Sequence, residues 1–285
     1  MRVLVTGGSG RLGRAVVRDL LAHGHDVVSA DRSSNPEDTS LPGLRFVQTD
    51  LGDVGQVAGA MAGREAVVHL GAIPSPYGHA DEVVFGNNVG ATFATLQAAA
   101  LLGVSKAVIA SSISALGGAW APEPFAPLYA PVDEAHPLLV EDCYGLSKEV
   151  DERTAEMFHR RTGMQVVALR FHWIATEAEA RERAGALRTD PRNDDWWRLF
   201  WGYVDVRDAA TACRLGIEAD GLGFAPFNIT AADTLSETPT EELLQTHAPG
   251  VDVRRPIPGT ASGFSLEAAR LRLGYEPSHS WRGPV

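Results

Sequence analysis

The sequence predicts an α/β fold built on a doubly wound parallel sheet, followed by a smaller part. Short apolar runs rich in valine alternate with segments of helical spacing over residues 1–170, and polar or glycine-rich turns separate them. Because parallel strands must be joined by long crossovers, this alternation favours a parallel sheet with helices on both faces. Residues 171–285 are less regular. We expect them to form the smaller part, with 203–220 packing back on the sheet.

Six apolar runs are the expected strands, and the first of them ends at glycines, as a buried parallel strand does. In chain order they span residues 1–6, 26–30, 44–48, 66–70, 106–110 and 165–170. Apolar positions three and four apart predict the helices. We expect helices over 13–23, 54–61, 88–102, 144–162 and 204–218, and two weaker ones within 235–275.

Composition favours a globular protein with a small-molecule partner. Of 285 residues, 45% are hydrophobic and 21% charged, so the chain can bury a sizeable core. Its formal net charge of −11 disfavours binding to nucleic acid or to an anionic membrane surface. No run approaches the roughly eighteen apolar residues that a membrane helix needs. Cys143 and Cys213 lie far apart without metal-ligand spacing, so we expect a reducing, cytoplasmic setting and no metal site.

A glycine-rich turn lies between the first expected strand and the first expected helix. Its residues are Gly7, Gly10, Arg11, Leu12 and Gly13. Glycines at such a junction let the backbone approach a pyrophosphate that is held at the helix N-terminus. Because the turn directly follows a strand and precedes a helix, it favours a Rossmann-type dinucleotide-binding domain over residues 1–170, rather than a plain tight turn.

Charged residues after the second and third strands bear on which dinucleotide binds. Asp31 ends the second strand, where a carboxylate accepts hydrogen bonds from the adenosine ribose and repels a 2′-phosphate, so NAD is favoured. Arg11 and Arg32 leave NADP open, because a guanidinium can hold that phosphate. Asp50 and Leu51 stand at the expected adenine contact, and an Asp that caps the following helix is an equal alternative.

The segment from Tyr144 to Lys148 is the strongest catalytic signal. Residues four apart lie on one face of a helix, so the phenol and the ammonium can meet at one site. A phenol with the ordinary pKa of about 10 is a poor acid–base group near neutral pH, and an adjacent cation favours the phenolate. Ser112 follows the fifth strand, at the edge of the sheet where active sites form. Its hydroxyl can hydrogen-bond a substrate oxygen, and a turn or cap serine is the alternative.

Together these motifs resemble the extended short-chain dehydrogenase/reductases, also called the NAD-dependent epimerase/dehydratase family. The resemblance covers nearly the whole chain and rests on Thr6-Gly7-x-x-Gly10-x-x-Gly13, Asp31, Asp50-Leu51, His69-Leu70-Gly71-Ala72, Asn88, Ser111-Ser112, Tyr144-x-x-x-Lys148 and the segment Tyr203 to Asp208. It implies that Tyr144 is the general acid/base, that Lys148 activates it and holds the nicotinamide ribose, and that Ser112 orients the substrate. It also implies that the cofactor site includes Leu70, Gly71, Ala72 and Asn88.

Departures from that family's pattern point to a small substrate. Members that act on nucleotide sugars carry Arg-x-x-Asn-x-x-Gly-Pro after the sixth strand, and here the Asn and Gly-Pro are absent from residues 170–177. The resemblance is nearest to uronate dehydrogenases, although Ile113 and Ser114 stand where those enzymes place Asn and His against the sugar acid. The part of the chain after Lys148 is also short for a nucleotide-sugar enzyme.

Further residues are candidates for the substrate site. By the same resemblance Arg198 is placed to clamp a carboxylate, and a surface arginine is an equal alternative. Ser75 and His172 are candidate substrate contacts as well, with a loop serine and a structural histidine as the alternatives. Ile113 completes the predicted substrate set.

These observations predict an NAD(P)-dependent oxidoreductase that transfers a hydride between the cofactor and a small sugar, sugar acid or other hydroxyl or carbonyl substrate. An epimerase or dehydratase that recycles its NAD is the first alternative, and a dinucleotide-sensing protein without turnover is the second. By the resemblance we also expect a homodimer paired through the helices at 88–102 and 144–162.

Overall fold

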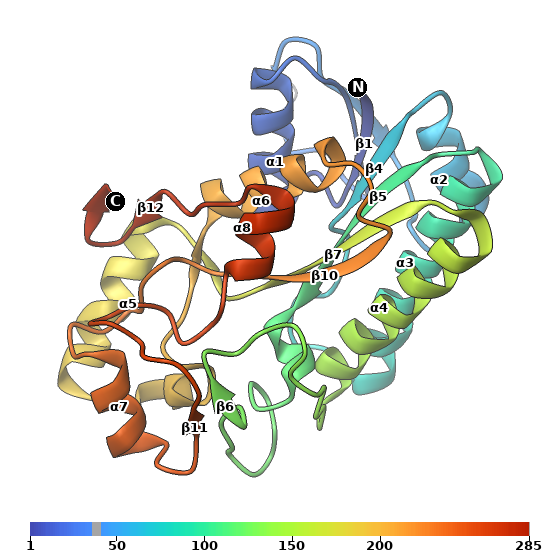
Figure 1. The fold of residues 1–285 in the computed structure, drawn as a ribbon. Coiled ribbons are helices and arrows are strands. Elements are labelled where there is room, and N and C mark those ends of the chain that lie inside the picture. Colours follow the sequence, from blue (N-terminus) through green and yellow to red (C-terminus); the bar gives the residue numbers. More distant parts are fainter. Residues whose placement is uncertain (36–40, 285) are drawn as a thin grey trace.

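The computed structural model describes residues 1–35 and 41–284, and its centre is a seven-stranded parallel sheet (Figure 1). The strand order β10-β7-β5-β4-β1-β2-β3 confirms the predicted doubly wound fold. The order reverses between β1 and β4, and such a reversal leaves a ligand-binding crevice at the carboxyl ends of the strands. The strands are β1 (Arg2–Thr6), β2 (Asp26–Asp31), β3 (Arg45–Gln48), β4 (Ala66–His69), β5 (Lys106–Ser112), β7 (Gln165–Phe171) and β10 (Phe224–Ile229).

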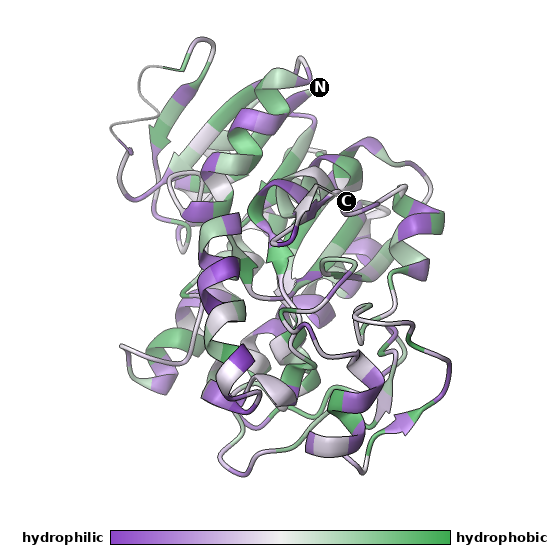
Figure 2. Cartoon of the chain, turned by 90° about the vertical axis from the view of Figure 1, so that its left-hand side faces the viewer, coloured by the Kyte–Doolittle hydropathy of each residue, from purple (hydrophilic) through white to green (hydrophobic). Residues whose placement is uncertain are grey.

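Alternate side chains of the strands face opposite layers of helices. Val3 and Val5 of β1 are buried in one apolar cluster, whereas Leu4 between them is buried in another. This is the period-two alternation of a strand that is covered on both faces. Figure 2 shows the strands as a largely hydrophobic interior between helices with polar outer faces. The first layer holds α1 (Arg11–Ala22), α6 (Val206–Glu218) and α8 (Glu267–Leu273), and the second holds α2 (Val54–Met61), α3 (Asp81–Leu101) and α4 (Cys143–Thr162).

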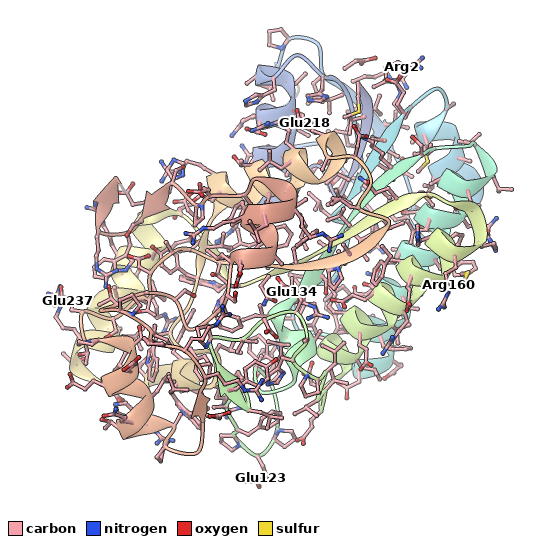
Figure 3. The ribbon with its side chains drawn as sticks, viewed as in Figure 1. Arg2, Glu123, Glu134, Arg160, Glu218 and Glu237 are labelled. Atoms are coloured by element: carbon pink, nitrogen blue, oxygen red, sulfur yellow. The ribbon has the colours of Figure 1, made fainter. Side chains whose placement is uncertain are left out.

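The smaller part is assembled from separate chain segments around a third apolar cluster, which includes Ile113, Val132, Trp201, Tyr203 and Phe264. It lies beyond the carboxyl ends of the sheet (Figure 1), and Arg2 and Glu123 mark opposite ends of the molecule in Figure 3. Two short parallel strand pairs, β6 with β11 and β8 with β9, join its segments. Its elements are η1 (Ile113–Leu116), β6 (Tyr129–Ala130), β8 (Ile174–Ala175), α5 (Glu177–Thr189), η2 (Asn193–Leu199), β9 (Val204–Asp205), α7 (Thr240–His247), β11 (Asp252–Val253), β12 (His279–Ser280) and β13 (Gly283–Pro284).

Two elements that the sequence does not predict are present in the structure. Strand β10 pairs with β7, so the sheet continues beyond the boundary expected at residue 170. Its strand pattern is interrupted by Pro226, which is tolerated because β10 is an edge strand. Helix α5 forms in the Arg-rich segment that shows no clear period. It begins with a capping box, in which the Thr176 hydroxyl accepts from the Glu179 backbone N–H while the Glu179 carboxylate accepts from the Thr176 N–H.

The helix expected over 88–102 also begins earlier, at Asp81. Asp81 and Glu82 lie in its first turn, where negative charge is favourable beside the helix N-terminus. Gly86 lies within the helix and does not interrupt it. The segment 203–220 contains β9 and α6, and α6 contributes buried side chains to the same apolar cluster as α1.

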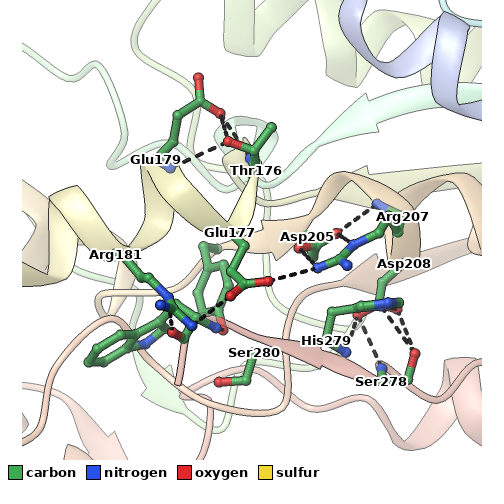
Figure 4. Close-up of polar contacts among 12 residues, drawn as sticks. Thr176, Glu177, Glu179, Arg181, Asp205, Arg207, Asp208, Ser278, His279 and Ser280 are labelled. Atoms are coloured by element: carbon green, nitrogen blue, oxygen red, sulfur yellow. Dashed lines mark hydrogen bonds and ion pairs between the residues drawn. The ribbon is translucent and has the colours of Figure 1, made fainter. Parts of the chain in front are cut away.

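Hydrogen bonds and ion pairs connect the C-terminal segment to the sheet domain (Figure 4). The Asp208 carboxylate of α6 accepts hydrogen bonds from the backbone N–H groups of Ser278 and His279, at 3.1 and 3.0 Å. The neighbouring Arg207 guanidinium lies 3.6 Å from the Glu177 carboxylate of α5. The first turn of α6, the start of α5 and the C-terminal segment are therefore joined at one place.

Within residues 1–35 and 41–284, no helix is long and apolar enough to cross a membrane. Over the same residues, no three or more His, Cys, Asp or Glu side chains gather in a group that could hold a metal ion.

Candidate active site

The turn between β1 and α1 requires glycine at two positions. Gly7 has a φ of +67°, and a Cβ on it would lie 2.6 Å from the backbone nitrogen of Gly71. A Cβ on Gly13 would lie 2.1 Å from the carbonyl oxygen of Gly7, so the first turn of α1 packs directly against the loop. The first N–H groups of a helix have no partner within the helix, and the helix dipole favours an anion beside them. This end of α1 lines a cavity.

The cavity has a volume of about 720 Å³ and extends from the glycine loop to the first turn of α4. The loop, the residue after β4, the end of β5 and the start of α4 thus border one continuous space at the carboxyl ends of the strands. A dinucleotide fits this arrangement, with its pyrophosphate at α1 and its reactive end at α4. Of the predicted cofactor and catalytic residues, the cavity is lined by Gly7, Gly10, Arg11, Leu12, Gly13, Leu70, Ala72, Ser112, Tyr144 and Lys148.

The residues expected at the adenosine end lie beside a second hollow, which is lined by Arg32, Gln48, Thr49, Asp50 and Gln56. The Asp31 carboxylate accepts a hydrogen bond from the backbone N–H of Ser9 at 3.0 Å, which ties the glycine loop to the end of β2. The Arg32 guanidinium donates to Asn87 Oδ1 at 2.8 Å. Arg11 instead donates to the Glu179 carboxylate at 2.9 Å and so links α1 to α5.

The alternative interpretation of Asp50 as a helix cap is wrong. Helix α2 is capped by Asp53, whose carboxylate accepts from the backbone N–H groups of Gly55 and Gln56. The Asp50 carboxylate accepts from the backbone N–H of Gly52 in the preceding turn, at 3.0 Å. Asp50 therefore stays a candidate for the adenine contact.

Leu51, Gly71 and Asn88 hold the loop after β4 in place. A Cβ on Gly71 would lie 2.1 Å from Cδ1 of the buried Leu51. The buried Asn88 amide accepts from the backbone N–H of Ile73 at 2.8 Å, donates to the Ile73 carbonyl at 3.0 Å, and donates to the Ser147 hydroxyl of α4 at 3.1 Å. These contacts connect the loop beside the cavity to the helix that carries Tyr144 and Lys148.

Tyr144 and Lys148 face the cavity from successive turns of α4. Asp142 starts the helix by accepting from the backbone N–H of Gly145, which places Tyr144 in the first turn. The Lys148 Nζ atom lies 5.8 Å from the centre of the Tyr144 ring. It donates to the Ala110 carbonyl at the end of β5 at 2.9 Å, and to the Asp151 carboxylate at 3.2 Å. The phenol and the ammonium are thus neighbours within one largely buried site.

The two adjacent serines that end β5, Ser111 and Ser112, both line the cavity, and their hydrogen bonds distinguish them. The Ser112 hydroxyl accepts from the backbone N–H of Ser114 at 3.0 Å, so it also caps η1. Ser111 donates to the Glu152 carboxylate at 2.6 Å, and that carboxylate forms a two-pronged ion pair with Arg170. The Ser111 hydroxyl is therefore held by a buried ion pair, whereas the Ser112 hydroxyl bonds within its own turn, where it also donates to the Ser114 hydroxyl at 3.1 Å.

His69 was not predicted to matter by itself, yet its buried side chain connects the end of β4 to β1 and α3. Its ring nitrogens lie within hydrogen-bond distance of the hydroxyls of Thr6, Thr92 and Thr95, at 2.7 to 3.3 Å. Burial lowers the pKa of His69 to about 3, and the Lys148 charge acts in the same direction, so the ring is neutral. No local sequence signal identifies it, because its partners come from two other elements.

The substrate end of the cavity is walled mainly by aromatic and aliphatic side chains, and its polar groups include Arg183 and Asp195. The Arg183 guanidinium stands over the Trp196 ring, 5.4 Å from its centre. The aromatic and aliphatic members of this wall are Ile113, Trp120, Phe171, Trp173, Trp196 and Leu199.

Three predicted substrate residues have other partners. Arg198 is not part of the cavity lining, because its buried guanidinium donates to the Gly118 and Ala121 carbonyls and pairs with Asp195 at 2.6 Å. His172 does border the cavity, but Nε2 faces the Leu199 carbonyl and Nδ1 accepts from the Trp173 N–H. Its burial lowers its pKa to about 4. The Ser75 hydroxyl accepts from the backbone N–H of Tyr77, outside the cavity.

Comparisons relate the chain to known proteins. A family model described as NAD dependent epimerase/dehydratase family matches residues 3–189. The chain is 31% identical over 223 residues to an L-arabinose 1-dehydrogenase (NAD(P)(+)) of Haloferax volcanii, a match that covers 76% of this chain and 83% of that protein. It is 29% identical over 222 residues to a uronate dehydrogenase of Pseudomonas putida, covering 78% and 73% of the two chains. A solved short-chain dehydrogenase/reductase superfamily protein from Agrobacterium tumefaciens, with bound NAD, matches with a TM-score of 0.74 at 25% identity, covering 99% of this chain and 94% of that one.

Proposed function

Because the chain belongs to the NAD-dependent epimerase/dehydratase family, we propose that it is an oxidoreductase that moves a hydride between NAD and one hydroxyl or carbonyl group of a small sugar or sugar acid. The observation that carries the proposal is the single cavity that connects the glycine loop to Ser112, Tyr144 and Lys148. A protein that only binds a dinucleotide needs the glycine loop. The acid–base residues at the other end are needed only for turnover.

The residues of the chain supply placement and proton transfer. When bound, NAD accepts or supplies the hydride. The Tyr144 hydroxyl exchanges a proton with the reacting oxygen of the substrate, and the Ser112 hydroxyl donates a hydrogen bond to that oxygen. Lys148 contributes a positive charge beside Tyr144, which favours the phenolate that must accept the proton of an alcohol. The glycine loop and the Asp31 carboxylate hold the other end of the cofactor.

The substrate end of the cavity favours a small ring-shaped molecule. Trp120, Trp173 and Trp196 line this end of the cavity and provide apolar surface for the C–H groups of a sugar ring. An anionic substituent on that ring would meet Arg183, which lines this end of the cavity. Arg198 is the less suitable partner, because it does not line the cavity, whereas Arg183 lines it while donating to Asn193 Oδ1 at 3.2 Å.

A screen of sugars and sugar acids with NAD and with NADP, followed by the absorbance of reduced nicotinamide, tests the proposal. We expect one substrate class to give a rise in absorbance that depends on enzyme and substrate. An epimerase or dehydratase that recycles its cofactor would change the substrate, as seen by chromatography, without net reduction of free cofactor. A sensor would bind the cofactor and convert nothing. Either of these two results would reject net dehydrogenation.

We also propose that two copies of the chain pair through α3 and α4. Val83, Phe93 and Leu101 of α3 and Leu146 of α4 are large apolar side chains that are 41–67% exposed. Covering them would remove apolar surface from water. We expect sedimentation to report the mass of two chains, and Phe93→Glu combined with Leu146→Glu to report the mass of one. A parent protein with the mass of one chain would contradict this pairing.

A further inference from the structure

A buried ion pair lies directly beside the tyrosine of the proposed active site. The Lys148 Nζ atom is 3.2 Å from Oδ2 of Asp151, which stands nearly one turn further along α4. Only 4% of the lysine side chain and 1% of the aspartate side chain are exposed. Taking two charges out of water costs several kcal/mol for each ion, so a buried ion pair adds little net stability. Its position beside Tyr144 therefore points to a role in the site.

One of the two oxygens of the Asp151 carboxylate lacks a hydrogen bond from the described residues. Burial raises the pKa of the Asp151 carboxyl, and the Lys148 charge and a hydrogen bond from the Thr92 side chain oppose that rise. Its second oxygen, Oδ1, is buried without a hydrogen-bond partner among the described residues. Buried carboxylates that act only as structural anchors normally have both oxygens hydrogen-bonded. The main interaction of Asp151 is therefore with the lysine charge.

The other titratable groups around the pair are compensated or neutral. On α4 itself, Glu152 forms an ion pair with Arg170 of β7 at 2.8 Å. From β4, His69 faces Lys148 as a neutral ring, because burial lowers its pKa to about 3. From α3, the Thr92 side chain that reaches the pair carries no charge. Among the described groups, the Lys148 ammonium lies 5.8 Å from the centre of the Tyr144 ring and is opposed by the Asp151 carboxylate. The Asp142 carboxylate at the start of α4 accepts from the backbone N–H of Gly145.

We propose that Asp151 is a positioning residue that anchors the Lys148 ammonium and moderates its action on the Tyr144 phenol. The ammonium is held between the Ala110 carbonyl and the Asp151 carboxylate, so it has a fixed place beside the ring. Because the two opposite charges lie 3.2 Å apart, the field that Tyr144 experiences is weaker than that of an isolated ammonium. This proposal rests on the proposed role of Tyr144, and it adds a residue that sets the pH range in which that role operates.

The test is a near-ultraviolet titration of the phenolate in the cofactor-free protein. The chain has five tyrosines. Burial raises the pKa of Tyr129 to about 12, and it raises those of Tyr203 and Tyr275 well above the ordinary value, so these three ionise late. A Tyr77→Phe background removes the tyrosine that is 68% exposed. Subtraction of the Tyr144→Phe titration then isolates the Tyr144 signal.

In Asp151→Asn we expect the Tyr144 titration midpoint to fall by about one pH unit, the order of size expected when a unit charge is removed from a partly buried site. Asp151→Glu keeps the charge, so its Tyr144 titration midpoint should equal that of the parent protein. Glu156→Gln is the matched control, because it makes the same change at a half-buried position on α4, two turns from Lys148. A midpoint in Asp151→Asn that is unchanged, or that rises, would overturn the proposal. The titration needs no turnover, so its failure is distinguishable from failure of the proposed function.

A second measurement covers the case in which Asp151→Asn does not fold. Lys148→Met alone leaves a buried carboxylate without its partner, whereas Lys148→Met with Asp151→Leu removes both charges. We therefore expect the double variant to unfold at a higher temperature than Lys148→Met. A double variant that is no more stable than Lys148→Met would show that the two charges do not act as a pair, and would overturn the proposal.

Discussion

The two ends of the cavity are constructed differently. The cofactor end is formed by backbone and small residues of the sheet domain, where neighbouring parallel strands must end at the same edge. The substrate end is formed by large side chains from segments 113–120, 171–174 and 183–199, which meet through the packing of the third apolar cluster. The first arrangement follows from the topology of the sheet. The second depends on how several separate segments pack together, so the topology of the sheet does not determine it.

This contrast predicts different effects of substitution at the two ends. Changes at the cofactor end should affect every substrate alike, because they act on the common reactant. Changes at the substrate end should affect one substrate class, or should destabilise the smaller part while the sheet stays intact.

The largest effect is expected at the glycine loop. In Gly13→Val, the new side chain would meet the Gly7 carbonyl oxygen, since a Cβ there is already only 2.1 Å away. The loop must shift at a cost of about 3 kcal/mol, so we expect NAD affinity to fall about 100-fold or more for all substrates. Calorimetric titration with NAD measures it. Gly59→Ala is the control, because a Cβ at that position in α2 has nothing within 4 Å. Unchanged NAD binding in Gly13→Val would show that the pyrophosphate lies elsewhere.

A smaller and more selective effect is expected for the two arginines of the smaller part. Arg183→Leu should raise KM about 10- to 100-fold for an anionic substrate and leave neutral substrates little changed, because it removes a charged hydrogen-bond donor from the cavity wall. Arg198→Leu should leave KM nearly unchanged and lower the free energy of unfolding by about 1–3 kcal/mol, because two carbonyls lose their donor. Initial rates and thermal unfolding separate the two. If instead Arg198→Leu raises KM for the anionic substrate and Arg183→Leu does not, Arg198 is the residue that binds the substrate carboxylate.

A third effect concerns stability alone, and it is a loss of stability in mild acid that both regions share. Burial holds the pKa of His69 at about 3 and that of His172 at about 4, below the ordinary 6.5. As the pH falls below about 6.5, the unfolded chain takes up a proton at each histidine while the folded chain does not. The free energy of unfolding should therefore decrease by about 1.4 kcal/mol per pH unit for each, down to about pH 4. Urea unfolding at several pH values measures this slope. His69→Gln and His172→Gln should each reduce the slope by the contribution of the histidine that is replaced. If neither variant changes the slope, these two histidines are not its cause.

Local sequence patterns were sufficient to predict the close packing of the glycine loop and the proximity of Tyr144 and Lys148. The glycine turn requires close backbone contacts that only Gly7 and Gly13 allow, and these stand at a fixed spacing from the first strand. Tyr144 and Lys148 lie four residues apart, and one helical turn determines their relative position. Such features depend on neighbours in the chain, so they can be predicted without knowing the packing.

The substrate end could not be predicted in the same way. Arg198 finds its carbonyl partners in a segment about eighty residues earlier, and nothing in its own neighbourhood indicates them. His69 is likewise held by threonines from β1 and α3. Strand β10 was missed for a local reason, because Pro226 within it argues against a strand until its edge position is known.

The most direct test of the central claim compares Tyr144→Phe with the parent in two measurements, NAD binding by calorimetric titration and turnover by the absorbance of reduced nicotinamide. If Tyr144 transfers the proton at the end of a cavity that binds NAD through the glycine loop, the variant should bind NAD within about twofold of the parent. Its kcat/KM should then fall about 10²- to 10⁴-fold. Turnover that survives the substitution, or NAD binding that is lost with it, would contradict the account.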